Sequence, residues 1–452
     1  MINFWDIEKF KNNVAIITEN ERITYSELLK RTEKVESALI EQPHRLVIIK
    51  CENNLNSIIN YLAVLRTNCP AILLDYNLNN EQIKTYIQKY QPHFILDKNI
   101  QKLQSDTQCS SELAILLSTS GSTGNPKLVR LSRKNIQVNA ESIAKYLNIR
   151  KTDRAITTLP FHYSYGLSVI NSHFLKGASI LLSSESVISK KFWNLINENK
   201  VTSFAGVPYT FDMLKKLRFE NLNLPHLRYI TQAGGKLSEE NGKYFTQICQ
   251  RKNIDFFIMY GQTEASPRMS YFKTNDFPKK INSIGKAIPG GKICLYDNSN
   301  NIVNNPYKNG ELVYYGQNVM MGYAENQQDL EKTDDLKGVL YTGDVAFFDE
   351  DGFFFIAGRK NRFTKIQGLR MNLDDLTQYF VSKSIDAVAV SNDLLICIIS
   401  EVNIDTEIRK TFLKQFKLHH SIVKFIQVEE IPKNSTGKIL FKNLENIFNE
   451  KK

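Results

Sequence analysis

The sequence has 452 residues, of which 42% are hydrophobic and 11% aromatic. This composition supports a large buried core and argues against bulk disorder. Lysine and arginine number 58 against 47 aspartates and glutamates, which gives a net charge of +11. Because no dense basic block accounts for the excess, we interpret it as a solvated, lysine-rich surface and expect no nucleic-acid partner.

The six cysteines include no CxxC pair and lie mostly in apolar runs, so we expect reduced, buried thiols in a cytoplasmic protein. The N-terminus lacks a basic start followed by an apolar segment, and no signal peptide is expected. No apolar run reaches the ~18 residues of a membrane-spanning helix. The sequence therefore predicts no membrane span.

The first predicted elements alternate between helix and strand. Residues 23–40 have apolar side chains at helical spacing, with Thr24 as N-cap and Glu27 three positions later. Residues 45–51 then form a short apolar run typical of a buried strand, and the same order of helix, turn and strand repeats over 56–97. Helices that alternate with short apolar strands predict an α/β fold with a mainly parallel sheet.

The rest of the chain suggests two domains. A second alternating run covers 201–264, whereas 283–357 contains short β-type runs separated by Asp, Asn and Gly, which suggests a smaller β-rich subdomain. The alternation of helix and strand returns after Arg359. We therefore expect a large N-terminal domain over 1–358 and a small C-terminal domain over 359–452.

The strongest local signal is the segment LLSTSGSTGNPKLVRLS at 116–132. It follows an apolar strand and contains only hydroxyl and glycine residues from Ser118 to Ser122. Such a loop presents backbone N–H groups and hydroxyls to anionic oxygens, and Lys127 adds a point charge for a phosphate. No Gly-Lys-Ser/Thr follows, so it is not a Walker A loop. The alternative is an ordinary flexible loop.

This loop resembles the ATP-binding loop of the adenylate-forming superfamily of acyl-CoA synthetases, peptide-synthetase adenylation domains and luciferases. Further motifs of the family follow in order over nearly the whole chain. The resemblance implies a large domain of stacked, mainly parallel sheets with helices and a small β-rich subdomain, then a small mobile α+β domain. It also implies that the loop wraps the β- and γ-phosphates of ATP. The loop residues so assigned are Thr119, Ser120, Gly121, Ser122, Thr123, Gly124 and Lys127.

YGQTEAS at 260–266 resembles the YGxTE motif of the family. The resemblance implies that Tyr260 lies against the adenine, that Thr263 contacts the α-phosphate and that Glu264 helps to hold Mg²⁺. A hard carboxylate oxygen suits Mg²⁺, which usually keeps waters and shares phosphate oxygens. Taken alone, a glutamate after a strand is equally well explained as an acid that favours a helix N-terminus.

Two further segments are assigned to the nucleoside. QAGGKL resembles the adenine-side loop, in which Gly234 and Gly235 leave room for a flat ring, although a plain strand-end turn would look the same. YTGDVAFFDEDGFFFIAGRK is a stronger match. There the resemblance implies that Asp344 accepts hydrogen bonds from both ribose hydroxyls, that Ile356 flanks the adenine and that Arg359 reaches the ribose. The DEDG within it is expected to be a hairpin turn without a catalytic role.

The C-terminal part carries the remaining family motifs. PKNSTGKI at 432–439 resembles the catalytic motif, which makes Lys438 the mobile lysine that stabilises the transition state at the α-phosphate. The family hinge is usually Asp or Lys, but here Asn361 occupies that position, and Asn tolerates unusual backbone angles. Gly368 corresponds to the loop that lines the thiol tunnel. This part is shorter than usual, which keeps a carrier protein open as the thiol donor.

The segment LPFHYSYGL at 159–167 resembles the substrate-pocket motif of acyl- and aryl-CoA ligases, which commonly has a histidine at its fifth position. Here Tyr163 stands at that position and His162 precedes it. On a strand, a shift of one residue changes the face, so a structural and a pocket-lining histidine both remain open. No aspartate is present to pair with a substrate ammonium group, which disfavours an α-amino acid.

These motifs together predict an acid–thiol ligase that uses ATP and Mg²⁺ to convert a carboxylic acid without an α-amino group into acyl-AMP. In a second step the small domain swings about Asn361, Lys438 leaves the site, and a thiol attacks the acyl carbonyl. We expect CoA as the acceptor, with an acyl carrier protein as the alternative, and a monomer or homodimer. The alternative of another class is a non-catalytic nucleotide-binding protein that has kept the fold.

Overall fold

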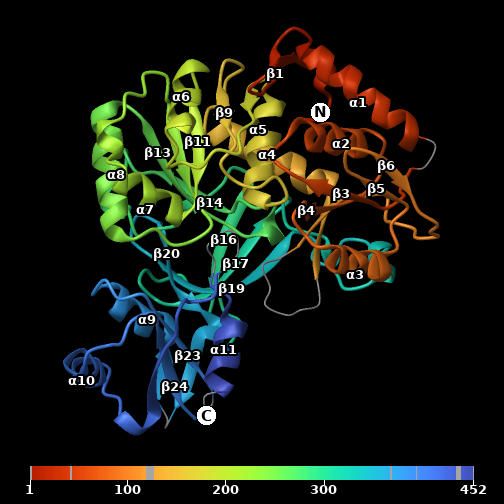
Figure 1. Ribbon diagram of the computed structural model, residues 1–452. Coiled ribbons are helices and arrows are strands. Elements are labelled where there is room, and N and C mark those ends of the chain that lie inside the picture. Colours follow the sequence, from red (N-terminus) through yellow and green to blue (C-terminus); the bar gives the residue numbers. More distant parts are fainter. Residues whose placement is uncertain are drawn as a thin grey trace. The chain divides into compact units, whose positions relative to one another are not determined.

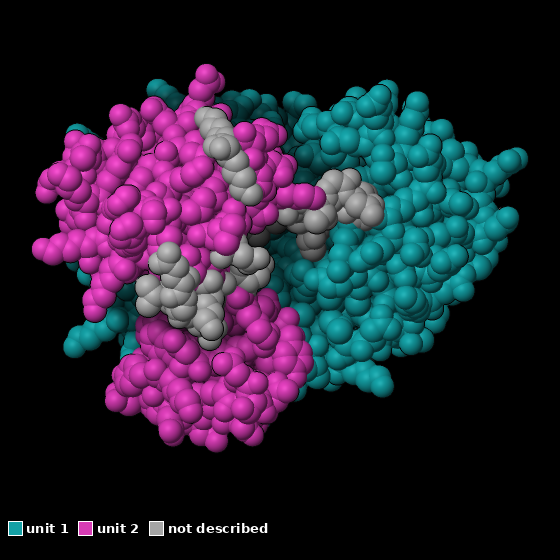
Figure 2. Space-filling view, turned by 90° about the horizontal axis from the view of Figure 1, so that it is seen from below, with its two compact units in different colours: residues 1–119, 126–293, 314–340 teal, residues 120–125, 294–313, 341–452 magenta. Residues whose placement is uncertain are grey.

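The computed structural model describes residues 3–40, 43–118, 127–366, 369–392, 394–433 and 439–450. The chain forms two compact units, which Figure 2 shows in different colours. Unit 1 consists of residues 1–119, 126–293 and 314–340, and unit 2 contains 294–313 and 341–452. The two expected architectures, a large α/β part and a small α+β part, are both present within these units.

The first helix confirms the predicted cap. Helix α1 spans Tyr25–Leu39, and Thr24 at its N-terminus forms a capping box with Glu27. The Glu27 backbone N–H donates to Thr24 Oγ1 over 3.2 Å, and the Thr24 N–H donates to Glu27 Oε2 over 2.7 Å. Two backbone donors that lack helical partners are satisfied in this way, which is why the helix begins here.

One sheet of unit 1 has the strand order β18-β8-β7-β4-β3-β5-β6. Its strands are β3 (Val47–Cys51), β4 (Ala71–Asp75), β5 (Phe94–Leu96), β6 (Ile100–Lys102), β7 (Leu113–Ser118), β8 (Leu128–Ser132) and β18 (Gly322–Ala324). Strand β3 is parallel to β4 and β5, and β4 is parallel to β7, whereas β6, β8 and β18 pair in antiparallel fashion. Helices α2 (Leu55–Arg66) and α3 (Asn80–Tyr90) connect the parallel strands, as parallel pairing requires (Figure 1).

The second sheet of unit 1 has the order β15-β14-β13-β12-β11-β9-β10-β1-β2. Its strands are β1 (Val14–Ile17), β2 (Arg22–Thr24), β9 (Arg154–Ile156), β10 (Ser179–Leu181), β11 (Ser203–Gly206), β12 (Tyr229–Gln232), β13 (Asp255–Tyr260), β14 (Ser270–Lys273) and β15 (Lys286–Ala287). The run from β1 to β13 is parallel, and both edges are antiparallel. The helices of this layer are α4 (Arg133–Tyr146), α5 (Ser164–Leu175), α6 (Lys190–Glu198), α7 (Pro208–Lys216) and α8 (Glu239–Lys252).

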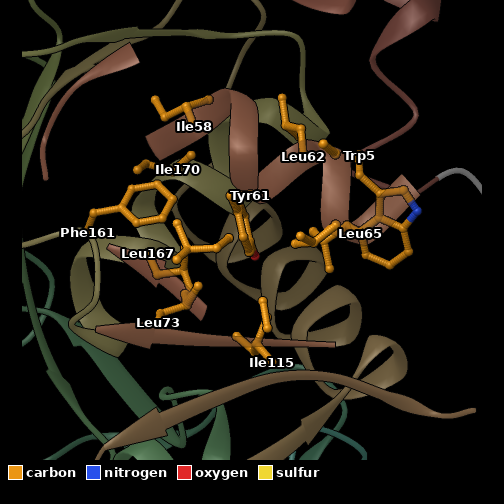
Figure 3. Packing of buried hydrophobic residues seen from close by; sticks show 14 of the residues in the cluster. Trp5, Ile58, Tyr61, Leu62, Leu65, Leu73, Ile115, Phe161, Leu167 and Ile170 are labelled. Atoms are coloured by element: carbon orange, nitrogen blue, oxygen red, sulfur yellow. The ribbon is translucent and has the colours of Figure 1, made fainter. Parts of the chain in front are cut away.

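Helix α5 is held between two apolar clusters. Figure 3 shows Leu167 and Ile170 of this helix in one of them, together with Tyr61 of α2 and Phe161. The ring centroids of Tyr61 and Phe161 are 5.4 Å apart in an edge-on arrangement, and the Tyr61 hydroxyl donates to Asn171 Oδ1 over 3.1 Å. The other cluster contains Tyr165. Helix α5 therefore has little freedom to rotate, which fixes the residues at its N-terminus.

The stretch expected to be β-rich forms a sheet of order β16-β17-β19-β20. Its strands are β16 (Gly291–Tyr296), β17 (Gly310–Gly316), β19 (Val339–Phe348) and β20 (Phe354–Arg359). Strands β19 and β20 form the expected hairpin, in whose turn Asp349 Oδ1 accepts from the backbone N–H groups of Asp351 and Phe353. Strand β18, from the same stretch of sequence, instead pairs with β8.

The C-terminal part is α+β. Strands β21 (Phe363–Ile366) and β22 (Leu369–Asn372) pair with each other, and β23 (Ala387–Ser391), β24 (Ile396–Ser400) and β25 (Val423–Gln427) form a sheet in that order. The helices are α9 (Leu373–Val381), α10 (Thr406–Gln415) and α11 (Phe441–Glu450). The core of this part contains aromatic contacts, such as that between the tilted rings of Phe380 and Phe412, whose centroids are 4.8 Å apart.

The cysteines and the apolar character of the helices bear on two expectations from the sequence, reduced thiols and the lack of a membrane span. Five of the six cysteines are buried and Cys294 is half-buried, and all six are free thiols. Within the described residues, none of the helices combines the length and the apolar character that crossing a lipid bilayer requires.

Candidate active site

The YGQTEAS segment lies where β13 ends. Tyr260 is the last residue of the strand, and Thr263 and Glu264 belong to the short 3-10 helix Thr263–Ala265. The turn between them is tight, because a Cβ on Gly261 would lie 1.7 Å from the Pro267 carbonyl oxygen. Glycine is therefore required there, and the turn exposes Thr263 and Glu264 at the carboxyl end of a parallel strand, where open α/β sheets bind their ligands.

The N-terminus of α5 connects this turn to the glycine loop after β12. The hydroxyls of Ser164 and Thr263 are 3.1 Å apart. The preceding residue, Tyr163, reaches the loop: a Cβ on Gly234 would lie 2.7 Å from the Tyr163 hydroxyl. Gly234 also has a φ of +84°, which favours glycine. The structure thus brings together Thr263, Tyr163 and Gly234, which the sequence had assigned to the same site.

Glu264 is oriented by a tyrosine that the sequence motifs do not contain. The Tyr323 hydroxyl donates to Glu264 Oε1 over 2.9 Å. Burial and the neighbouring Glu264 raise the pKa of Tyr323, so its hydroxyl keeps the proton that it donates. Lys127 lies against the same ring, with Nζ 3.6 Å from its centroid and 3.5 Å from Glu325 Oε1. Tyr323 therefore contacts both Lys127, the predicted phosphate-binding lysine, and Glu264, the predicted Mg²⁺ ligand.

The residues at Glu264 fit a Mg²⁺ ion. The carboxylate is half-buried, one of its oxygens accepts from Tyr323, and the Thr263 hydroxyl precedes it on the same turn. No group of three or more His, Cys, Asp or Glu that suits a metal occurs among the described residues. A cation at Glu264 would thus take its remaining ligands from water and phosphate oxygens, which is the usual coordination of Mg²⁺ at nucleotide sites.

The assumption that LPFHYSYGL forms a strand was wrong. The segment is a turn, and α5 begins at Ser164 with Tyr163 as its N-cap residue. Consecutive side chains therefore diverge because of the turn and not because of a strand pleat. His162 Nε2 lies 3.8 Å from Asp75 Oδ2, away from the contact that Tyr163 makes with the Gly234 loop. Burial lowers the pKa of His162, and Asp75 opposes this only in part.

In unit 2 the hairpin brings Asp344 and Arg359 together. The two residues are direct cross-strand partners on β19 and β20, and Arg359 Nε lies 3.2 Å from Asp344 Oδ1. The Asp344 side chain is 6% exposed, whereas that of Arg359 is 61% exposed. Ile356 is on the same strand, opposite Ala346. The hairpin register therefore explains why these ribose-assigned residues occur fifteen positions apart in the sequence.

Several assigned residues cannot be placed. Those outside the described residues are Thr119, Ser120, Gly121, Ser122, Thr123, Gly124, Gly368 and Lys438. The backbone of Asn361 belongs to the 3-10 helix Lys360–Arg362. Gly235 follows Gly234 in the described loop, where a Cβ would lie 3.0 Å from Pro208 Cγ.

Sequence reasoning missed Ser164, Tyr323 and Arg268. Ser164 lies within the pocket motif directly after Tyr163, but the motif singles out only the fifth position, which Tyr163 occupies. Arg268 follows Glu264 by four positions, and nothing in the sequence indicates that it is buried. Tyr323 had no signal of its own, since its position beside Glu264 depends on the pairing of β18 with β8.

Comparison with known proteins is consistent with this geometry. Residues 4–112 and 102–324 match the family described as AMP-binding enzyme. Luciferin 4-monooxygenase from Photuris pensylvanica is 25% identical over 445 residues, which cover 90% of this chain and 77% of that protein. A long-chain-fatty-acid–CoA ligase from Bacillus subtilis is 26% identical over 354 residues, covering 74% of this chain but only 61% of the ligase.

Solved structures share the fold. The o-succinylbenzoate CoA synthetase (MenE) from Bacillus subtilis, in complex with its acyl-adenylate intermediate, has a TM-score of 0.80 at 19% identity over 98% of both chains. ATP-bound MatB from Rhodopseudomonas palustris has a TM-score of 0.81 at 19% identity over 99% of both chains. Because the family match covers well over half of the sequence, the chain belongs to the AMP-binding enzyme family.

Proposed function

We propose that this protein is an acid–CoA ligase, which activates a carboxylic acid as acyl-AMP and then forms a thioester. The observation that supports this most is the arrangement at the end of β13. There the Thr263 hydroxyl lies beside Ser164, and Tyr323 orients the Glu264 carboxylate. The adjacent residue Tyr163 contacts the Gly234 loop. A hydroxyl, a metal-binding carboxylate and a glycine wall are the parts that a nucleotide-activating site needs.

In the first step, a carboxylate oxygen of the acid attacks the α-phosphorus of ATP. The bond between that phosphorus and the oxygen bridging to the β-phosphate breaks, and pyrophosphate leaves. The Thr263 hydroxyl donates a hydrogen bond to the α-phosphate. Lys438 lies between the two anionic reactants and offsets their repulsion, which is electrostatic stabilisation of the transition state. The Ser/Gly loop and Lys127 hold the outer phosphates.

Separate residues are assigned to the metal, the adenine and the ribose of the nucleotide. Glu264 would hold Mg²⁺, which would supply positive charge to neutralise the phosphate oxygens. Gly234, Gly235, Tyr260 and Ile356 form the adenine site. Asp344, which pairs with Arg359 over 3.2 Å, accepts hydrogen bonds from the ribose hydroxyls, and a carboxylate can accept two of them.

In the second step, residues 359–452 rotate about Asn361 and remove Lys438, and the backbone at Gly368 lines the path of the thiol. The thiol sulfur attacks the acyl carbonyl, the carbon–oxygen bond to AMP breaks, and the thiol proton is released. We favour CoA as the acceptor because several relatives are described as CoA ligases. Transfer to a carrier protein is measured in the same assay with a phosphopantetheinyl protein in place of CoA. The free thiols favour a cytoplasmic location.

ATP–pyrophosphate exchange over a panel of carboxylic acids tests the proposal. At least one acid should support exchange, and Lys438→Ala should lower the rate by roughly 10²–10³-fold, the usual effect of removing a placed electrostatic stabiliser. Lys433→Ala is the matched control, because Lys433 is five positions earlier and pairs with Asp386 over 3.6 Å. If exchange is equally fast in the Lys438→Ala variant, the lysine is wrongly assigned. If none of the acids in the panel supports exchange, the proposed function is refuted.

A further inference from the structure

Unit 1 contains a buried arginine without an acidic partner. Arg268 is 3% exposed, and its Nε has no hydrogen-bond partner within the described part of the chain. Other buried arginines are paired: Arg130 Nη2 lies 2.6 Å from Asp335 Oδ2, and Arg362 Nε lies 2.9 Å from Asp374 Oδ1. No aspartate or glutamate among the described residues comes within ion-pairing distance of Arg268. A buried guanidinium remains charged, and its burial is unfavourable unless an anion pairs with it.

The surroundings of Arg268 offset its burial only in part. Its guanidinium carbon is 4.0 Å from the centre of the Tyr165 ring, a cation–π contact; its side chain hydrogen bonds with Tyr146, and Tyr163 lies near it. These groups are neutral. The backbone is fixed, because the Arg268 carbonyl accepts from the side-chain amides of Asn139 over 3.2 Å and Asn318 over 2.8 Å. The cationic side chain is therefore held in place without a protein anion.

Arg268 lines a small cavity of about 20 Å³ enclosed by α4, α5, β11 and β12. That volume accommodates one group the size of a water molecule. The polar lining includes Tyr165, Thr231, Tyr229 and His173. His173 Nδ1 donates to the Val169 carbonyl over 2.7 Å, so Nε2 is left to accept from the Tyr229 hydroxyl at 3.2 Å. Arg268 is thus the cation at this cavity, and the histidine is neutral.

The cavity adjoins the proposed site of adenylation. Tyr165 follows Ser164, and its hydroxyl is 2.8 Å from that of Thr231, three residues before Gly234. Thr263 and Arg268 belong to one folded turn, since the Asn318 side-chain amide donates both to the Ala265 and to the Arg268 carbonyl. The backbones of Thr263 and Arg268 therefore belong to the same turn, which places the cavity beside the proposed reacting end.

We propose that the substrate is a short dicarboxylic acid, whose second carboxylate pairs with Arg268 while the first is adenylated. This inference rests on the proposed function and specifies its substrate class. A carboxylate supplies the counter-charge and accepts from the free Nε–H of Arg268. The cavity excludes a long alkyl tail by its size, because its volume of about 20 Å³ has no room for one. Arg268 is then the specificity-determining residue.

The test compares ATP–pyrophosphate exchange by the 452-residue chain with three acids: glutaric acid, its monomethyl ester and pentanoic acid. Malonic, succinic and adipic acids vary the length, and dodecanoic acid represents long chains. The wild type should prefer the best diacid over its monoester by roughly 10- to 100-fold in kcat/KM, the range for a hydrogen bond to a charged group. Arg268→Met should abolish this preference with little change in the KM for ATP.

Two further variants separate recognition from stability. Arg268→Lys keeps the charge and should retain part of the diacid preference, and it serves in place of Arg268→Met if that variant fails to fold. Arg133→Met removes another partly buried arginine, one that does not line the cavity, and should leave the preference unchanged. Exchange with monoacids alone, or a diacid preference that survives Arg268→Met, overturns this inference but not the proposed function. If none of the acids supports exchange, both this inference and the proposed function are refuted.

Discussion

The contact between Tyr163 and Gly234 makes a quantitative prediction. In Gly234→Ala the new Cβ would lie 2.7 Å from the Tyr163 hydroxyl and 3.1 Å from Val207 Cγ1, at a φ of +84°. The left-handed backbone costs an alanine about 1–2 kcal/mol, and overpacking typically costs ~1–3 kcal/mol. We therefore expect the free energy of unfolding to fall by about 2–5 kcal/mol, and the KM for ATP to rise because the loop shifts.

The two contributions separate in a double variant. Without its hydroxyl, the nearest remaining Tyr163 atom, Cζ, is 3.9 Å from the new Cβ, an ordinary contact distance. Tyr163→Phe should therefore restore part of the loss caused by Gly234→Ala, while the backbone contribution remains. Urea unfolding of the two single variants and the double variant measures the coupling. A Gly234→Ala variant as stable as the wild type, or a double variant that shows no recovery, would refute the reasoning.

Three further predictions follow from individual contacts. Tyr323→Phe removes the donor to Glu264, and the Mg²⁺ concentration for half-maximal activity should rise roughly 10-fold; an unchanged Mg²⁺ dependence would contradict this. Asp344→Asn should raise the KM for ATP by about 10-fold through loss of a charged acceptor, whereas Asp351→Asn in the exposed turn should not, and equal effects would refute the ribose assignment. Burial lowers the pKa of His173 to about 4. As the pH falls, His173 is therefore protonated in the unfolded chain before it is protonated in the folded protein. The stabilisation that comes from keeping His173 neutral is fully present above pH ~6.5 and is lost toward pH 4, which lowers the free energy of unfolding by about 3 kcal/mol in all. In His173→Gln the free energy of unfolding should depend less on pH in that interval, and a pH profile identical to that of the wild type would refute the prediction.

The parts of the fold with strong local signals were predictable. The capping box at Thr24 and Glu27 and the alternation of helix and apolar strand depend on residues close together in sequence, and both are present. The hairpin of β19 and β20 was likewise visible in its DEDG turn. The pairing of β18 with β8 was not, since it joins segments nearly two hundred residues apart and neither carries a pairing signal of its own.

The site shows the same division. Thr263, Glu264 and Gly234 could be predicted as site residues because their motifs concentrate the special residues in a few positions. Arg268 was missed because the inference about it depends on its burial and on the lack of an acidic partner. Neither property can be read from one sequence. The error at LPFHYSYGL has a similar origin: an apolar run with aromatic residues favours a strand locally, but the packing of α5 between two clusters makes it a turn and a helix start.

The central claim is that a carboxylate oxygen of the acid attacks the α-phosphorus of ATP. The most direct test is to label both carboxylate oxygens of an accepted acid with ¹⁸O, add ATP, Mg²⁺ and CoA, and analyse the phosphorus products by mass spectrometry. Because the thiol displaces AMP from the acyl carbon, the account predicts one ¹⁸O atom in AMP and none in pyrophosphate. Label in pyrophosphate or inorganic phosphate, or thioester formed together with unlabelled AMP, would contradict it.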